Sequence, residues 1–438
     1  MADTNTLQAW NLVWERAANN ALKTDIIPES PFGKTVSITA PLTLYVDVAG
    51  SDLNPGTQNA PFASIQAALD SLKGLEIAAP VNIQVGAGTF AGFYVPALTV
   101  LQPIGATSAS VTLTGTISNS ISGTCVTSTV DGTMVLTDAS KAWTVDEHVG
   151  KLVTATVNGA SPVTLNCFGN SATQLFIGIN GAGYTEYTIH NMDTVLTPVN
   201  MNSNNCCILM PSGLATAQVS QLNVTRIRNA FSTTNAIIMR GGNLQLTQCT
   251  FGATSSGNVV NFFGGHLSTT TVVFTGPTSS SGNGISASST AFGQVSLNTT
   301  AFSVMGNGIS LISPSLYVGG NNTIFYKCNT GGINALWGSS LAMIGGLTKF
   351  QNCGIGVNLS NGSKLSFAIA TNVCGTGNTT CFSVAKGSRC NVPSVATITG
   401  TTELNVDGTT GTIATMRATS PKVFPVSPGS AYLSQIYE

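Results

Sequence analysis

Hydrophobic and polar residues alternate over short stretches along much of the chain, and turn residues separate these stretches. Between Asn235 and Gly400 the alternation repeats with a period of 23 to 25 residues. Short strands with a steady period of this length are typical of a solenoid, in which each coil packs on the next. The repeating segments begin at Asn235, Asn258, Asn283, Asn307, Gly332, Ile355 and Asn378.

One aliphatic residue recurs near the start of the successive segments, and stacking would place these residues in a ladder inside the barrel. They are Ile237, Val260, Ile285, Ile309, Ile333 and Val357. Four segments open with Asn after Gly, and Asn amides at equivalent positions can hydrogen-bond from one coil to the next. Because the spacing of a leucine-rich repeat is absent, the pattern predicts a right-handed parallel β-helix.

A capping helix is predicted in front of the solenoid. The stretch "LTLYVDVAGSDLNPGTQNAPFASIQAALDSL" (42–72) reads as a strand, a turn and an amphipathic helix, and "VNIQVGAGTF" (81–90) then begins the first coil. The expected apolar face of the helix comprises Phe62, Ile65, Ala68, Leu69 and Leu72. This opening resembles pectin-lyase-like β-helix proteins, particularly bacteriophage tailspikes. "GAGTFAG" leads into "FYVPALTV" rather than a helix, which argues against a dinucleotide-binding loop.

A second resemblance covers 126–193. The stretches "TMVLTDASKAWTVDEHVGKLVTATV" and "NSATQLFIG" are similar to a small β-rich insertion of phage tail and spike proteins, with Trp143 and Gly150 at its most recognisable positions. The sequence therefore divides into an N-terminal helical attachment segment (1–40), a cap with the first coils (41–125), an inserted small β-domain (126–193), the main β-helix (194–402) and a C-terminal tail (403–438).

The first forty residues contain a short heptad-like pattern. Leu7, Trp10 and Trp14 are spaced by three and four residues, and Ala17 and Ala21 continue the spacing. Two interpretations remain open. The helix either docks on the protein's own body, or it joins identical subunits or plugs into a particle. Residues 403–438 end in an apolar and aromatic tail that suits a subunit contact.

Composition supports a mainly β protein. Of the 438 residues, 42% are hydrophobic and only 8% are charged, which excludes a disordered chain. The ten cysteines follow no metal-binding spacing and are expected to be buried thiols. The start of the chain lacks the features of a secretory signal, and no apolar run has the ~20 residues of a membrane helix. We expect assembly in the cytoplasm of the producing cell and no insertion into a membrane.

The distribution of charges favours binding over catalysis. Residues 194–402 contain eight bases and no Asp or Glu, whereas residues 1–193 contain 14 acids and six bases. Glycoside hydrolysis uses two carboxylates, and calcium-dependent lyases hold their ion with carboxylates, so the coils lack the groups for either reaction. No cofactor, metal site or catalytic residue is predicted. The basic coils would attract an anionic glycan, lipopolysaccharide or an acidic protein, unless each charge is simply solvated.

Two catalytic alternatives stay open. A metal-free lyase could use side chains such as Arg240, His266, Tyr317, Tyr326 and Lys327, and an inter-subunit site could use Glu403 or Asp407. The three histidines are isolated in the sequence, so their spacing indicates no triad. His148, beside Asp146 and Glu147, is expected to be a solvated residue of the insert.

Candidate glycan-binding residues come from the same basic and aromatic set. Arg240, Phe263 and Trp337 share the sixth position of their segments and would form an outward column for stacking sugars. A one-residue change of register would turn Trp337 into the core. The candidate receptor-binding residues are Arg240, His266, Tyr326, Lys327 and Trp337, and the candidate attachment or oligomerisation residues are Leu7, Trp10 and Trp14.

The resemblance implies a virion structural protein of the tailspike or tail-fibre type, acting as a homotrimer. Its partners would be other virion proteins, contacted through the N-terminal segment, and a host surface glycan that is bound without cleavage. Nucleic acid is not among the expected partners. Two alternatives are a capsid-decorating or head-fibre protein and a polysaccharide depolymerase.

Overall fold

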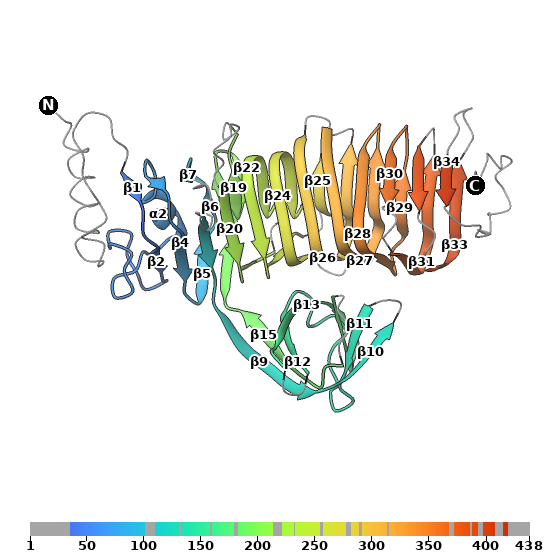
Figure 1. Ribbon diagram of the computed structural model, residues 1–438, viewed down its shortest axis with the longest axis horizontal. Helices are drawn as coiled ribbons and strands as arrows, with labels where there is room; N and C mark the ends of the chain where they lie inside the picture. Colours follow the sequence, from blue (N-terminus) through green and yellow to red (C-terminus); the bar gives the residue numbers. More distant parts are fainter. Residues whose placement is uncertain are drawn as a thin grey trace.

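The computed structural model shows a long parallel β-solenoid with a smaller antiparallel domain beneath it (Figure 1). It describes residues 36–100, 110–130, 133–157, 160–178, 183–212, 221–231, 233–254, 257–276, 282–288, 291–312, 315–367, 372–385, 388–392, 397–407 and 415–418. No helix within these ranges has the length and apolarity needed to cross a bilayer. The predicted segment 1–40 lies outside the described residues except for its last few positions.

The solenoid is one 22-stranded sheet whose strands pair in parallel from coil to coil. Its first strands are β2 (Leu42–Val46), β4 (Val81–Val85), β5 (Gly88–Ala91), β6 (Phe93–Tyr94), β8 (Val111–Thr114), β16 (Thr194–Thr197), β19 (Ile208–Met210), β20 (Gln221–Thr225), β21 (Arg228–Asn229), β22 (Ile237–Thr247) and β23 (Thr250–Gly252). The later strands are β24 (Val260–Thr275), β25 (Asn283–Ala287), β26 (Phe292–Ile312), β27 (Ser315–Leu336), β28 (Ser340–Gln351), β29 (Ile355–Leu359), β30 (Lys364–Phe367), β31 (Asn372–Ala385), β32 (Arg389–Val392), β33 (Thr397–Asp407) and β34 (Thr415–Ala418).

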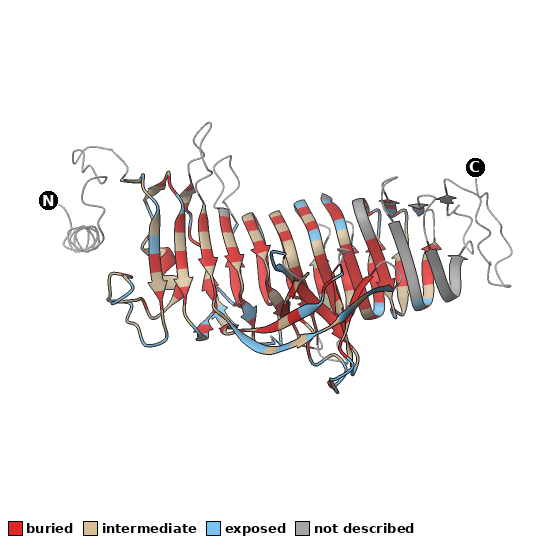
Figure 2. Ribbon diagram, turned by 60° about the horizontal axis from the view of Figure 1, so that its bottom comes forward, coloured by how far each residue is buried: buried red, intermediate tan, exposed pale blue. Residues whose placement is uncertain are grey.

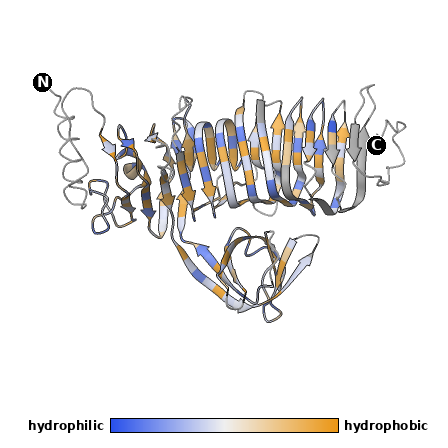
Figure 3. Ribbon diagram, in the orientation of Figure 1, coloured by the Kyte–Doolittle hydropathy of each residue, from blue (hydrophilic) through white to orange (hydrophobic). Residues whose placement is uncertain are grey.

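The register confirms the predicted parallel β-helix. The aliphatic ladder runs without interruption through paired positions and is fully buried: Ile237, Val260, Ile285, Ile309, Ile333 and Val357. Hydrophobic and hydrophilic residues alternate along the strands of the coils (Figure 3), and the buried ones form continuous rows along the solenoid (Figure 2). Each coil therefore buries its apolar face only because a neighbouring coil covers it.

A column of phenylalanine rings occupies the core. Phe302 lies 5.0 Å from Phe325, which lies 5.0 Å from Phe350, and both pairs are stacked almost in parallel. Glycines at the coil starts make room for these rings. A Cβ on Gly308 would lie 2.4 Å from the ring of Phe325, so the Asn-Gly pairs of the repeat serve packing as well as turn formation.

The predicted asparagine ladder is confirmed at three coils. Asn283 Nδ2 donates to Asn258 Oδ1 at 2.8 Å, and Asn307 Nδ2 donates to Asn283 Oδ1 at 2.8 Å. Asn378 differs, because its amide is buried and bonds to the backbone around Cys353 and Phe350. Nine of the ten cysteines have described side chains; these nine are free thiols, eight of them buried, and burial raises the pKa of Cys249 to about 12.

The cap follows the prediction. Helix α2 (Ile65–Asp70) lies at the N-terminal end of the solenoid (Figure 1), and Ser64 caps it by accepting from the amide of Ala67. Asp52 in turn accepts from the amide and hydroxyl of Ser64. The whole predicted apolar face is buried: Phe62, Ile65, Ala68, Leu69 and Leu72. Beside the cap, β1 (Ser37–Ile38), β3 (Glu76–Ile77) and β7 (Thr99–Val100) form a small parallel sheet, and β17 (Val199–Met201) and β18 (Asn204–Cys206) form a hairpin.

The inserted domain is a seven-stranded antiparallel sheet with its own core. Its strands are β9 (Ile117–Thr124), β10 (Val126–Val130), β11 (Thr133–Thr137), β12 (Leu152–Thr156), β13 (Val163–Asn170), β14 (Gln174–Ile177) and β15 (Glu186–Met192). Trp143 is buried in this core. The sheet begins at Ile117, earlier than the start at residue 126 expected from the sequence. The reason is that β9 pairs with β15, and these two strands connect the insert to the solenoid (Figure 1).

Candidate functional site

The inserted domain docks on one side of the solenoid through an apolar row. Val273, Ala301 and Ile324 occupy paired positions on successive coils and pack against Phe168 of the insert. Outward positions of a solenoid are ordinarily polar, since water covers them. Here the insert covers them instead, and Val273 is completely buried.

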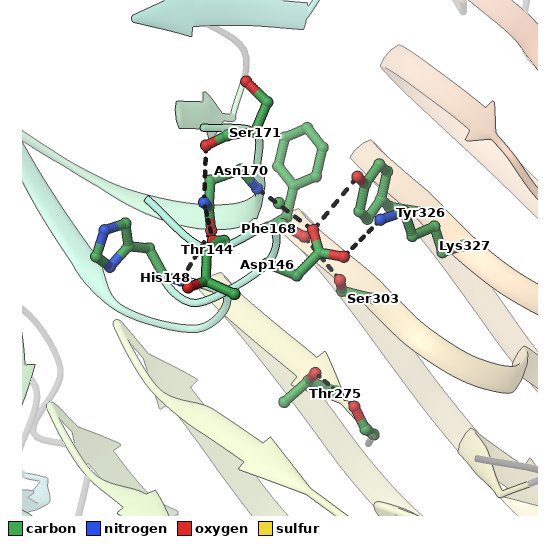
Figure 4. A network of polar contacts seen from close by, with 12 residues as sticks. Thr144, Asp146, His148, Phe168, Asn170, Ser171, Thr275, Ser303, Tyr326 and Lys327 are labelled. Atoms are coloured by element: carbon green, nitrogen blue, oxygen red, sulfur yellow. Dashed lines mark hydrogen bonds and ion pairs between the residues drawn. The ribbon is translucent and has the colours of Figure 1, made fainter. Parts of the chain in front are cut away.

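Polar contacts fix the insert in this position (Figure 4). Lys327 Nζ lies 2.5 Å from Asp146 Oδ2, and the hydroxyl of Ser303 donates to the carbonyl of Phe168 at 2.7 Å. A further contact lies deeper in the interface, where Lys349, which is fully buried, donates to Thr133 Oγ1 at 2.6 Å. The docked arrangement therefore combines apolar burial with charged contacts that hold its register.

The loop that carries Asp146 is held rigid from inside the insert. The buried Asn170 accepts from the amide of His148 at 2.8 Å and donates to the carbonyl of Thr144 at 2.7 Å. Figure 4 shows Asn170 between these two partners. Asp146 has φ of +62°, a conformation that non-glycine residues rarely adopt, so the loop is specified by these contacts rather than by backbone preference.

The next residues of the same loop form one wall of a cleft between the insert and the solenoid. Gly150 adopts φ of +81° and packs against Thr250, whose hydroxyl donates to the Gly150 carbonyl at 2.5 Å. The cleft has a volume of about 490 Å³. Its lining comes from the insert, the connecting strand β15 and three solenoid coils: Val149, Gly150, Lys151, Asn191, Met192, Asp193, Arg228, Asn229, Phe231, Thr250, Gly252 and Thr275.

An exposed aromatic ring stands at this cleft. The side chain of Phe231 is 53% exposed, and its ring lies over Gly252, where a Cβ would approach it to 2.3 Å. Asn229 ties the same stretch to Gly252 through two hydrogen bonds of 2.8 and 2.7 Å. The ring is thus presented on a fixed support, which is the arrangement that stacks on the apolar face of a sugar.

Charged and polar groups surround the ring. Arg228 is exposed and its Nε donates to the carbonyl of Met192 at 2.9 Å. Lys151 comes from the insert, and Asp193 accepts from Ser118 at 3.0 Å. Asp193 is the single carboxylate among the lining residues, so the cleft lacks the pair of carboxylates that a glycosidase uses. No group of three metal-ligating side chains occurs among the described residues.

The structure places the five predicted receptor-binding residues in different environments. Tyr326 is 3% exposed and lies with Lys327 beneath the insert, so both serve the docking contact in place of the ligand surface suggested by the sequence. Arg240 is exposed, bonds to Asn204 and lies 5.8 Å from the ring of Phe263. His266 is half-buried beside Ser296.

Trp337 is 60% exposed, which places it outward rather than in the core. It does not line the cleft, and neither do Arg240 and His266. The three attachment candidates Leu7, Trp10 and Trp14 lie outside the described residues, and so do the side chains of Glu403 and Asp407.

His148 corrects a sequence expectation. It is fully buried rather than solvated, and its ring lies 5.1 Å from Trp143 in an edge-on arrangement. Both ring nitrogens are buried without a hydrogen-bond partner. Burial, together with the nearby charge of Lys151, holds the pKa of His148 below its usual value, although Glu147 opposes the shift.

The residues that form the cleft could hardly be recognised from the sequence. Arg228 and Phe231 belong to the coil "RIRNAF", which precedes the regular repeats, and Lys151 belongs to the insert. Their proximity depends on contacts such as that between Gly150 and Thr250, which are 100 residues apart. An apolar outward row at Val273, Ala301 and Ile324 was the one available signal that another part of the chain covers the solenoid.

No protein-family model matches the chain, and no curated protein matches it. Among solved structures the chain is similar to a chain described as a glycoside hydrolase, with 8% identity, coverage of 86% of this chain and 96% of that one, and a TM-score of 0.31.

Two phage proteins also match. The gp54 tailspike of Acinetobacter baumannii bacteriophage AP22, in complex with A. baumannii capsular saccharide, has 11% identity, coverage of 81% and 74%, and a TM-score of 0.20. The gp61 tailspike of Pseudomonas phage phi297 has 12% identity, coverage of 81% and 71%, and a TM-score of 0.21. At these scores the similarities assign no activity, and the strand register of the chain itself defines the fold.

Proposed function

We propose that the protein is a tail-type virion protein of a bacteriophage that binds a host surface glycan in the cleft between its insert and its solenoid, without cleaving it. The observation that carries the proposal is the Phe231 ring, exposed on a rigid support in a cleft lined by Arg228, Lys151 and amide and hydroxyl side chains. Aromatic faces flanked by such polar groups are the usual means of holding a sugar.

The carboxylate content of the cleft supports binding over cleavage. Retaining and inverting glycosidases both place two carboxyl groups about 5 to 9.5 Å apart across the scissile bond. Asp193 is the single acidic residue among those that line the cleft. A bound glycan would therefore meet cations and an aromatic ring, but no acid and base pair.

The proposal extends to assembly. As a tail-type protein the chain would act as a homotrimer in the virion and would attach to other virion proteins through residues 1–40. Sedimentation equilibrium of the purified protein measures its oligomeric state, and a trimer is expected. Attachment is tested with a variant that lacks residues 1–40. This variant should fold and bind glycan but fail to be incorporated into particles.

Incubation with surface polysaccharides purified from a panel of bacterial strains tests glycan binding. Retention of at least one polysaccharide with unchanged chain length, measured by size-exclusion chromatography, is the expected result. Shortened chains would show a depolymerase, whose acidic groups would then have to be sought outside the cleft. Absence of retention across the panel would contradict glycan binding and favour a capsid-decorating role.

A further inference from the structure

Two cations face the cleft without an opposing acid. Arg228 uses Nε to bond to Met192, and its two terminal nitrogens make no hydrogen bond within the described residues. The ammonium of Lys151 forms no ion pair with any described carboxylate. Asp193, the one acid in the lining, accepts from Ser118 and lies beyond ion-pair distance of both cations.

The surroundings do not neutralise these charges. The solenoid coils from 194 to 402 contain no Asp or Glu, so an acid from the neighbouring coils cannot approach Arg228. Lys151 belongs to the insert, and the two acids of its loop have other partners: Asp146 pairs with Lys327, and Glu147 accepts from the amide of Thr144. Arg228 and Lys151 outnumber Asp193 in the lining, and low-dielectric walls concentrate the resulting positive potential, which favours an anion.

The guanidinium of Arg228 has the geometry for such an anion. Its Nε bond to the Met192 carbonyl fixes the plane of the group at the cleft wall and leaves the two terminal nitrogens as donors. A planar pair of donors of this kind matches a carboxylate or a sulfate, whereas Lys151 supplies a point charge from the insert. The Phe231 ring stands on the same stretch of chain as Arg228, three residues further on.

We infer that the cleft recognises a saccharide carrying an anionic substituent, a carboxylate or a sulfate, held between Arg228 of the solenoid and Lys151 of the insert while a sugar ring stacks on Phe231. This inference rests on the proposed glycan binding and adds the charge of the ligand. Because the two cations come from different parts of the molecule, the site is complete only while the insert is docked.

A matched oligosaccharide array tests the inference. The array carries uronic-acid oligosaccharides beside their carboxyl-reduced neutral forms, and sulfated oligosaccharides beside their desulfated forms. The full-length protein is compared with Arg228→Gln, Lys151→Gln and the control Lys364→Gln, which removes an exposed solenoid lysine that does not line the cleft.

The expected result is binding to an acidic member, loss of about tenfold or more on removal of its anion, and a similar loss in Arg228→Gln and Lys151→Gln but not in Lys364→Gln. Whether reduction or desulfation abolishes binding identifies the anion. Equal binding of acidic and neutral forms would overturn this inference and leave glycan binding intact. Absence of binding to every member, acidic or neutral, would overturn both.

Discussion

Lys327 Nζ lies 2.5 Å from Asp146 Oδ2, a contact that joins the solenoid to the insert across 181 residues of chain. The pair is partly shielded, with 32% of the Lys327 side chain and 12% of that of Asp146 exposed. The loop that carries Asp146 continues into Gly150 and Lys151 at the cleft. The contact therefore controls where the wall of the proposed site lies.

Breaking this ion pair should loosen the insert. Lys327→Met leaves the shielded carboxylate of Asp146 without its cation, at an expected cost of about 1 to 2 kcal/mol. Hydrogen exchange of residues 144–150, followed by mass spectrometry, should become faster. The matched control is Lys73→Met, which breaks the exposed pair between Lys73 and Asp70 and should leave exchange in the loop unchanged.

The same pair has a defined pH dependence. Burial alone would lower the pKa of Lys327, but the hydrogen bonds to Asp146 and Tyr326 outweigh it, so the pKa is raised. A raised pKa in the folded state contributes stability below the unfolded value of about 10.5 and loses it as the pH rises through the folded value. The lysine of the pair should thus stay charged at neutral pH and lose its charge only in strongly alkaline solution.

Acidification should destabilise the insert through His148. Its pKa is lowered in the folded state, so the unfolded chain takes up the proton more readily. Stability is then fully present above pH ~6.5, the usual histidine value, and falls as the pH drops below it. His190, whose pKa burial and Arg226 also lower, should act in the same direction.

Thermal unfolding between pH 8 and pH 5 measures this effect. His148→Leu should show a shallower loss of stability than the wild type as the pH falls. The comparison at pH 8, where both side chains are uncharged, isolates the effect on packing. An identical pH dependence of the two proteins would show that His148 does not titrate with unfolding.

The asparagine ladder should contribute measurably to stability. Asn283 makes one bond to Asn258 and one to Asn307, so Asn283→Ala removes both and leaves two polar groups unpaired. We expect a loss of about 1 to 3 kcal/mol in the free energy of unfolding, measured by denaturant titration. Ser286→Ala, on the outer face of the same coil, is the control and should change the free energy by less than about 0.5 kcal/mol.

The phenylalanine column should be far less tolerant of substitution than the asparagine ladder. Phe302 is fully buried and contacts Phe274 on one side and Phe325 on the other. Phe302→Ala should cost about 3 to 5 kcal/mol because it leaves a cavity that the rigid coils cannot fill. Phe302→Leu keeps most of the volume, and its smaller loss in the same titration would attribute the effect to packing.

The solenoid could be predicted from the sequence because its determinants are local and repeated. Each coil carries its own aliphatic residue, such as Ile285 or Ile309, and the one-coil spacing fixes which residues pair. The cleft could not be predicted in this way. Arg228 and Lys151 line one cleft only when the insert is docked, and docking depends on tertiary contacts such as that of Asn166 with Thr271, 105 residues apart.

Tertiary contacts also decide which of the predicted receptor-binding residues are exposed. Tyr326 is an aromatic residue of the kind that stacks on sugars, but the insert covers it. The one sign of this cover in the sequence is the apolar outward row that includes Ala301 and Ile324. Trp337 is exposed, as one of the two interpretations required, yet it does not line the cleft. Whether a residue is exposed and whether it lines the cleft are thus separate questions, and the periodicity settled neither for these two residues.

The most direct test of the account compares two exposed aromatic residues. Phe231 is 53% exposed at the cleft, and Trp337 is 60% exposed away from it. Retention of a polysaccharide that the wild type binds is measured for Phe231→Ala and Trp337→Ala, after circular dichroism has shown that both fold. We expect a loss of about tenfold or more for Phe231→Ala and wild-type retention for Trp337→Ala. The reverse pattern would contradict the cleft as the binding site and place the glycan on the outer corner of the coils.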